Sequence, residues 1–296
     1  MGSFPPVPPP HGPESYRGGP GSAPEYLPPD AGFIPPPSEQ QPVRRQRPLW
    51  AVSPATYILV GINCLVFIAM VAHHVSPFSP TSDQLLFWGA DNASAVLNYG
   101  EWWRIVTAMF VHVGIIHLAT NMWCLWNLGL LAEPLMGSTG LLAAYILTGA
   151  AGNLLSTFFN WWHYSVPANP AGIVYGPVGA GASGAVFGLA GVLIVLLKSP
   201  RLPIPQFELR KLRKSVIYFA AINLLIGAAT MAPGIGIHID NMAHLGGFSC
   251  GLLFAVPLVP RLGSPRQLFA TRLRMGVAMI VGVLVLFGFY LAQLPG

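Results

Sequence analysis

Long apolar stretches with few charges dominate the chain after about residue 50. Seven of them approach the roughly 20 residues that a helix needs to cross about 30 Å of hydrocarbon. They cover residues 55–72, 113–132, 140–159, 180–197, 215–232, 242–259 and 275–294. The fourth, fifth and sixth are short and rich in glycine or alanine, so packing against neighbours must determine their placement. The pattern predicts an all-α polytopic membrane protein with seven transmembrane helices.

The composition favours the same class of protein. Of 296 residues, 53% are hydrophobic and 8% are charged, whereas a soluble domain carries about 25% charged residues. A soluble globular enzyme is therefore excluded. The cysteines Cys64, Cys124 and Cys250 lie within apolar stretches, at spacings unlike those of metal sites. We expect neither a disulfide nor a metal ion, and no cofactor.

Residues 1–48 differ from the rest because they hold 15 of the 30 prolines, with Gly, Ser and Gln. Such a segment buries too little apolar area to offset the entropy of ordering, so it is predicted to be a disordered cytoplasmic tail. Its first thirty residues contain no apolar run typical of a signal peptide. The proline-rich stretches also suit a partner that binds extended peptides, although a solvated tail is the favoured interpretation.

The basic residues predict the orientation of the helices, because cytoplasmic loops carry an excess of Lys and Arg. With a cytoplasmic N-terminus and seven crossings, 14 of the 15 basic residues face the inside and the C-terminus is external. Only Arg104 falls in an external loop. This asymmetry accounts for the net charge of +5 without a nucleic-acid partner. The inside residues are Arg17, Arg44, Arg45, Arg47, Lys198, Arg201, Arg210, Lys211, Arg213, Lys214, Arg261, Arg266, Arg272 and Arg274.

Hydrogen-bonding residues inside apolar helices are costly, and each marks a candidate functional site. His117 and Asn121, four residues apart, share one face of the second helix. They lie about four and eight residues from its external end. Ser183 and His244 lie about three and two residues from the external ends of the fourth and sixth helices. At 1.5 Å per residue, these four side chains converge in one layer about 3–12 Å below the external end of the bundle.

Glycines give the fourth and sixth helices small-residue faces, which let backbones approach closely in a membrane. If the two faces meet, Ser183 and His244 come within reach of each other. A serine beside a histidine is the nucleophile-and-base arrangement of acyl transfer. The oxyanion that then forms needs donors, which an imidazole N–H, an asparagine amide and the Ser183 backbone N–H would supply. The glycine pairs are Gly184 with Gly188 and Gly247 with Gly251.

These residues resemble the rhomboid family of intramembrane serine proteases over most of residues 55–260. The resemblance implies that Ser183 is the nucleophile and His244 the general base, with His117, Asn121 and the Ser183 amide as the oxyanion hole. Phe187, one turn after Ser183, matches an aromatic residue that packs on the catalytic imidazole. The matching residues are Trp103-Arg104, His112, His117, Asn121, Glu133, Gly137, Gly181-Ala182-Ser183-Gly184, Ala243-His244-Leu245-Gly246-Gly247 and Gly251.

The resemblance also implies an architecture and a substrate class. Residues 49–262 would form a six-helix rhomboid-like core, and residues 263–296 a basic cytoplasmic loop with one extra C-terminal transmembrane helix. Substrates would be single-span membrane proteins, cut near the external end of their helix. The proline-rich tail and the expected absence of a transit peptide and of disulfides favour a bacterial plasma membrane.

Four polar residues near this layer have other interpretations. Arg104 and Glu133 are interpreted as structural residues that pin the first external loop and the inner turn. His112 is interpreted as a loop anchor. Asp240, four residues before His244, is a candidate third member that would orient the imidazole, although the resemblance favours a two-residue dyad.

Two other functions compete with proteolysis. A non-proteolytic rhomboid-like protein would bind membrane clients, but such relatives lack the dyad or block it, whereas small residues flank Ser183 here. A transporter or channel would need polar residues along a path across the bundle. The polar residues cluster near one face, which disfavours that function.

Overall fold

The computed structural model describes residues 49–164, 176–199, 202, 204–229, 239–259 and 265–294. Within these ranges the regular structure is helical, apart from one isolated bridge between Asp91 and Gly179. The predicted tail, residues 1–48, lies outside the described residues. The helices are α1 (Leu49–Val52), α2 (Pro54–Ala72), α3 (Ser82–Phe87), α4 (Ala93–Leu97), α5 (Arg104–Thr107), α6 (Ile115–Tyr164), α7 (Ser183–Leu196), α8 (Gln206–Ala229), α9 (Asn241–Ala255) and α10 (Arg266–Leu291).

The long helices confirm the predicted class. Among the described helices, α2, α6, α8 and α10 are long and apolar enough to cross a membrane. The apolar α7 has only 14 residues, and α9 has 15. The chain is therefore an all-α polytopic membrane protein, while the count of seven crossings stays a prediction.

Helix α6 contains the second and third predicted spans. Its 50 residues are helical except at Gly137, where φ is 74° and two helical segments meet at a kink. Glycine adopts positive φ without the strain that a side chain would cause. Pro134, one turn earlier, lacks the N–H that a continuing helix would use. The two spans are thus joined by a sharp change of direction.

Two helices start earlier than the apolar stretches predict. Helix α8 begins at Gln206 rather than 215, and α10 begins at Arg266 rather than 275. Both added segments carry several Lys and Arg residues, which the criterion of an uncharged span excludes. The apolar pattern therefore predicts only the part of each helix that crosses the hydrocarbon. It does not predict the charged turns by which the helix extends beyond that part.

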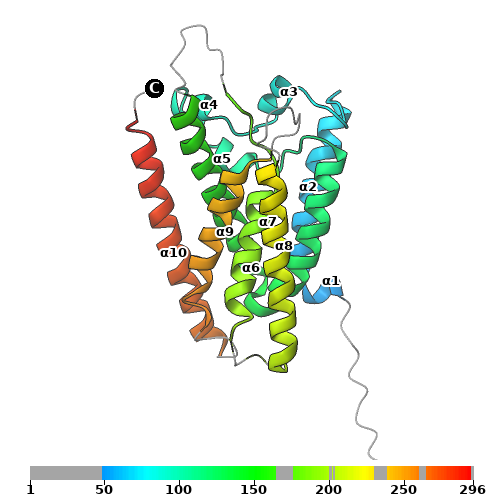
Figure 1. Cartoon of the computed structure of the whole chain (residues 1–296), viewed down its shortest axis with the longest axis vertical. Helices are drawn as coiled ribbons and strands as arrows, with labels where there is room; N and C mark the ends of the chain where they lie inside the picture. The colour runs from blue at the N-terminus through cyan, green and yellow to red at the C-terminus, as the bar shows by residue number, and fades with distance from the viewer. Residues whose placement is uncertain are drawn as a thin grey trace, which may run out of the picture. The chain divides into compact units, whose positions relative to one another are not determined.

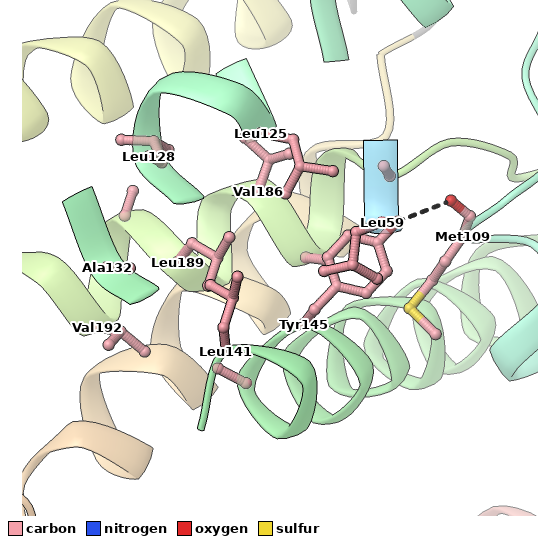
Figure 2. Close-up of a cluster of buried hydrophobic side chains, with 14 of the residues drawn as sticks. Leu59, Met109, Leu125, Leu128, Ala132, Leu141, Tyr145, Val186, Leu189 and Val192 are labelled. Atoms are coloured by element: carbon pink, nitrogen blue, oxygen red, sulfur yellow. Dashed lines mark hydrogen bonds between the residues drawn. The ribbon is translucent and has the colours of Figure 1, made fainter. Parts of the chain in front are cut away.

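Helix α7 lies inside the bundle, among α6, α8 and α9 (Figure 1). Eleven of its 14 residues are buried, against four of 24 in α8 and four of 26 in α10. Figure 2 shows the core where α7 meets α2 and both segments of α6; there the Tyr145 hydroxyl donates to the carbonyl of Met109 at 3.4 Å. Core side chains drawn there include Leu59, Leu125, Leu128, Ala132, Leu141, Val186, Leu189 and Val192.

The predicted contact between the glycine faces of α7 and α9 is confirmed. A Cβ added at Gly247 would overlap the carbonyl of Gly184, and one added at Gly251 would overlap the carbonyl of Gly188. The two backbones therefore touch without intervening side chains. This seam places Gly184, the second residue of α7, against Gly247, the seventh residue of α9.

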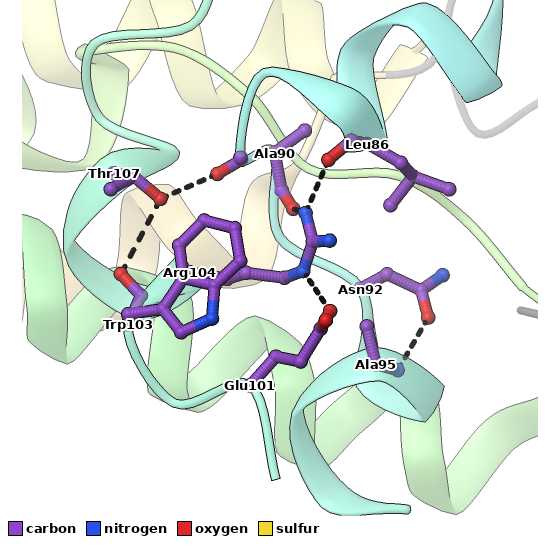
Figure 3. Close-up of polar contacts among 9 residues, drawn as sticks. Leu86, Ala90, Asn92, Ala95, Glu101, Trp103, Arg104 and Thr107 are labelled. Atoms are coloured by element: carbon purple, nitrogen blue, oxygen red, sulfur yellow. Dashed lines mark hydrogen bonds and ion pairs between the residues drawn. The ribbon is translucent and has the colours of Figure 1, made fainter. Parts of the chain in front are cut away.

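Arg104 pins the loop between α2 and α6, as predicted. Its guanidinium donates to the carbonyls of Leu86 and Ala90 at 2.6 and 2.9 Å, and to the carboxylate of Glu101 at 2.6 Å (Figure 3). It also lies over the ring of Trp103. One buried cation thus joins α3, α5 and the turn before α4.

Glu133 ties two helices together near α1. Its carboxylate accepts from the backbone N–H groups of Ala55 and Thr56 at 2.9 and 2.8 Å, and from the hydroxyls of Thr56 and Ser138. The N-terminus of α2 has unpaired N–H groups that a carboxylate stabilises. The predicted role at the inner turn is confirmed by the Ser138 bond and extends to the anchoring of α2.

Candidate active site

A cavity of about 540 Å³ lies among the beginnings of α6, α7 and α9 and the later part of α8. Ser183, His244, His117 and Asn121 all line it. The predicted residues thus converge on one hollow from three helices. Figure 1 shows that α7 and α9 begin at the end of the bundle that carries α3 and α4, opposite α1.

Ser183 is the first residue of α7, not the third as counted from the apolar stretch. The preceding residue is Ala182, which offers no side chain to cap the helix. The first N–H groups of a helix have no partner within the helix, so those of α7 stay available to a ligand in the cavity. The hydroxyl and the amide of Ser183 therefore belong to the same end of one helix.

The turn before Ser183 requires a glycine. Gly181 has a φ of 132°, and a Cβ there would lie 2.5 Å from Cε1 of His117. The imidazole of His117 thus packs directly on the backbone two residues before Ser183. The N–H of Gly181 donates to the carbonyl of Ala108 at 2.9 Å, which ties the turn to the residue after α5.

His112 also holds this turn. Its ring is fully buried, and Nε2 accepts the N–H of Ala182 at 3.4 Å while Nδ1 lies 3.3 Å from the carbonyl of Phe110. Because Nε2 is the acceptor, Nδ1 is the protonated nitrogen of the neutral ring. These contacts support the predicted role of loop anchor.

His244 is the fourth residue of α9 and is 6% exposed. Its ring stacks on that of Phe187, with centroids 4.2 Å apart and planes 13° apart. Phe187 lies one turn after Ser183 on α7, so one helix carries both the serine and the ring that supports the imidazole. The glycine seam described above runs immediately beside this pair.

Asp240 caps α9 and does not hydrogen bond to the imidazole. One carboxylate oxygen accepts the N–H of Ala243 at 2.9 Å, and the other accepts the hydroxyl of Ser156 at 2.5 Å. Nδ1 of His244 is buried and has no hydrogen-bond partner among the described residues. In this part of the chain the structure contains a serine and a histidine, but no carboxylate that orients the histidine.

His117 and Asn121 are the third and seventh residues of α6, on one face as predicted. Nδ2 of Asn121 donates to the carbonyl of His117 at 2.9 Å, which uses one of its two hydrogens. The second hydrogen is left for another acceptor. The buried Nδ1 of His117 has no partner in the described ranges.

Several lining residues were not singled out from the sequence. They include Phe219 and Asn223 on α8, and Thr120 and Cys124 on α6. Asn223 met the criterion of a polar residue in an apolar span, but nothing in the sequence placed its face of α8 toward the site. Within the described ranges, no group of three His, Cys, Asp or Glu residues is arranged to hold a metal ion.

Comparisons with known proteins identify the family. A model of the rhomboid domain matches residues 99–261. The chain is similar to the rhomboid protease GluP of Bacillus subtilis, with 31% identity over 76% of this chain and 38% of that protein. It is also similar to the rhomboid protease AarA of Providencia stuartii, with 30% identity over 69% of this chain and 72% of that protein.

A plant relative extends the comparison. RHOMBOID-like protein 1 of Arabidopsis thaliana is 34% identical over 62% of this chain and 42% of its own length. The chain therefore spans less than half the length of two of these three relatives and nearly three quarters of the third. The family model covers more than half of this chain, including all four lining residues predicted above. This chain belongs to the rhomboid family.

Proposed function

We propose that this protein is an intramembrane serine endopeptidase that cleaves single-span membrane proteins near the external end of their transmembrane helix. The observation that carries the proposal is the shared cavity, which Ser183 of α7 and His244 of α9 both line beside a glycine seam. The stacking of Phe187 on His244 supports a fixed relation between the two helices at this level. The relatives named as proteases support the same class of activity.

In the proposed reaction, the Ser183 oxygen attacks the carbonyl carbon of the scissile peptide bond. Neutral His244 accepts the hydroxyl proton, and the carbonyl oxygen becomes the oxyanion of a tetrahedral intermediate. Collapse of this intermediate breaks the C–N bond, and His244 returns the proton to the leaving amine. Water then attacks the acyl-enzyme with His244 as base, and Ser183 regains its proton when the carboxylic acid product leaves.

Three groups are proposed to stabilise the oxyanion: the backbone N–H of Ser183, the imidazole of His117 and the second amide hydrogen of Asn121. The uncapped N-terminus of α7 supports the first. The contact of His117 with the turn before Ser183 supports the second, and the position of Asn121 one turn further along α6 supports the third. Each such donor contributes about 100- to 1000-fold to the rate of acyl transfer.

The proposed orientation places this cavity on the external side of a bacterial plasma membrane. The basic starts of α8 and α10 support a cytoplasmic location for the opposite end of the bundle. The N-terminus is then cytoplasmic and the C-terminus external. Exposed aromatic residues such as Phe87 and Trp103, in the loop near the cavity, suit the water–lipid interface.

Cleavage of a tagged single-span reporter by purified protein in liposomes tests the proposal. Ser183→Ala is expected to lower the cleavage rate a thousandfold or more, as loss of the nucleophile does in other serine proteases, by about 10⁶ in one of them. Ser215→Ala, which alters an exposed serine of α8, serves as the matched control and is expected to cleave normally. Undiminished cleavage by the Ser183→Ala protein would exclude this mechanism.

A non-proteolytic protein that binds membrane clients is the second candidate, because some relatives are named only as rhomboid-like. The same reporter distinguishes the two functions. A client-binding protein would retain the reporter in pull-downs without cleaving it, and Ser183→Ala would change neither result.

A further inference from the structure

The segment of residues 176–182 leads directly into Ser183 and is held by hydrogen bonds from the loop between α3 and α4. Asp91 and Gly179 exchange both backbone hydrogen bonds, at 2.7 and 2.8 Å. The side-chain amide of Asn92 donates to the carbonyls of Gly176 and Pro177. The position of the serine therefore depends on a loop that is 84 or more residues away in the sequence.

Two carboxyl groups flank the middle of this segment. A Cβ built on Gly179 would lie 3.5 Å from Oδ2 of Asp240 and 3.9 Å from Oδ2 of Asp91. Consecutive hydroxyls of α6 bind the two acids: Ser156 donates to Asp240 at 2.5 Å, and Thr157 donates to Asp91 at 3.0 Å. The loop, the 176–182 segment and the start of α9 thus meet at two acids.

Asp91 is 3% exposed, and its Oδ1 is buried without a hydrogen-bond partner in the described part of the chain. Burial raises the pKa of Asp91 to about 7, against hydrogen bonds from the Thr157 side chain and the Asn92 backbone, which lower it. Among the described ionisable groups that act on it, Asp240 raises this pKa and Arg104 lowers it. Burial raises the pKa of Asp240 as well. An ionised pair here would place two like charges beside Gly179.

We propose that Asp91 is a positioning residue for Ser183, which holds the 176–182 segment when protonated and releases it when ionised. The proposal rests on the proposed protease function, because it concerns how the nucleophile is held. Asp91 does not line the cavity and acts only through the backbone between Gly179 and Ser183.

The direction of the pH effect follows from proton linkage. In the held state Asp91 keeps its proton up to about pH 7, whereas a released, solvated carboxyl has the ordinary pKa of 3.8. The held state therefore binds the proton more tightly, and its advantage is complete below pH 3.8. As the pH rises from 3.8 toward 7, the ratio of held to released protein falls by at most about tenfold for each pH unit. Above about pH 7 this ratio is constant.

Labelling of Ser183 by a fluorophosphonate, measured against pH in the full chain, tests the proposal. Dividing the wild-type rate by the Asp91→Asn rate removes the titration of His244 and the hydrolysis of the probe. We expect this ratio to fall between pH 5 and pH 7, by up to about tenfold for each pH unit, and to stay nearly constant from pH 7 to pH 9. Asp83→Asn, in the exposed part of α3, is the matched control. The wild-type rate divided by the Asp83→Asn rate should be independent of pH.

Thr157→Val gives a second, independent variant. It removes a hydrogen bond that lowers the pKa of Asp91. The labelling rate divided by the Asp91→Asn rate should therefore become constant at a higher pH than in the wild type. A purely structural role for Thr157 would lower labelling equally at every pH. A levelling point that stays in place or moves down contradicts the proposal.

Hydrogen exchange of the 176–183 peptide in the Ser183→Ala protein provides a readout that needs no catalysis. After correction for intrinsic rates, protection of the Gly179 and Gly181 amides relative to the Asp91→Asn, Ser183→Ala double variant should fall between pH 5 and pH 7. If Ser183 is labelled but the ratio of the wild-type rate to the Asp91→Asn rate does not change with pH, the inference is overturned and the protease function is left intact. Protection that changes as expected, without labelling at any pH, supports the inference and contradicts the protease function.

Discussion

At the residue scale, the imidazole of His244 is positioned by an aromatic ring. The stack on Phe187, at 4.2 Å between centroids, sets the plane of the imidazole. The carboxylate of Asp240 is occupied by Ser156 and by the N–H of Ala243, so it does not take this part. The orientation of the proposed general base would thus depend on packing against an aromatic ring, whereas in a catalytic triad it depends on a hydrogen bond to a carboxylate.

Replacing Phe187 tests this dependence. Phe187→Leu keeps an apolar side chain but removes the stacking face, which is worth about 0.5–1.5 kcal/mol for a ring pair. We expect kcat for reporter cleavage to fall about two- to tenfold, with KM nearly unchanged. Phe254→Leu, a fully buried ring of α9 that does not line the cavity, is the control: it should lower thermal stability and leave kcat intact. Equal kcat values for the two variants would contradict the role of the stack.

The four predicted lining residues could be found from the sequence because polar groups are conspicuous in apolar helices. Asn223 has the same character, yet its position in the cavity depends on how α8 is rotated against its neighbours. Asp91 had no signal at all. It lies in a loop without periodicity, and its bridge to Gly179 joins segments far apart in the chain.

At the scale of elements, the glycine seam between α7 and α9 determines how close Ser183 and His244 can come. The carbonyls of Gly184 and Gly188 occupy the space where side chains of α9 would lie. Because Ser183 directly precedes Gly184 and His244 lies one turn before Gly247, a small separation of the seam moves the serine and the histidine apart. The seam was predictable from glycines four residues apart.

A methyl group in this seam should therefore impair stability and activity together. In Gly251→Ala the added Cβ overlaps the carbonyl of Gly188, and such overpacking costs about 1–3 kcal/mol. We expect a lower thermal midpoint and slower reporter cleavage. Gly282→Ala on α10 is the matched control, since its added Cβ meets no atom within 4 Å. If the two variants have equal midpoints and rates, the seam does not have this role.

Other features of the elements were beyond the apolar pattern. The charged first turns of α8 and α10 continue helices outside the predicted crossings. The positions of the short helices α3, α4 and α5 depend on local caps and on Arg104. One such cap is the pair of reciprocal hydrogen bonds between Thr81 and Gln84 at the start of α3, and Arg104 donates to the carbonyl of Leu86 in the same helix. Hydrophobic periodicity carries no information on such short elements.

At the scale of the whole molecule, the two ends of the described helical bundle have different polar contacts. Near α1, Glu133 fixes the start of α2. At the opposite end, the loop that Arg104 organises meets the segment leading into Ser183 (Figures 1 and 3). Helix α10 adds to this end, because its Leu291 packs in a cluster with Val96 and Ile105 of the loop helices. The proposed site is thus bordered by the loop that Arg104 organises, and α10 packs against the helices of that loop.

If His244 activates the hydroxyl of Ser183, a reagent that attacks activated serines forms its covalent adduct at that residue. The protein in liposomes is treated with a fluorophosphonate, digested and analysed by peptide mass spectrometry. We expect one phosphonylated residue, Ser183, whose modification is lost in a folded His244→Ala protein and kept in His163→Ala. An unmodified Ser183 in the folded wild-type protein, or a modification that persists without His244, would contradict it.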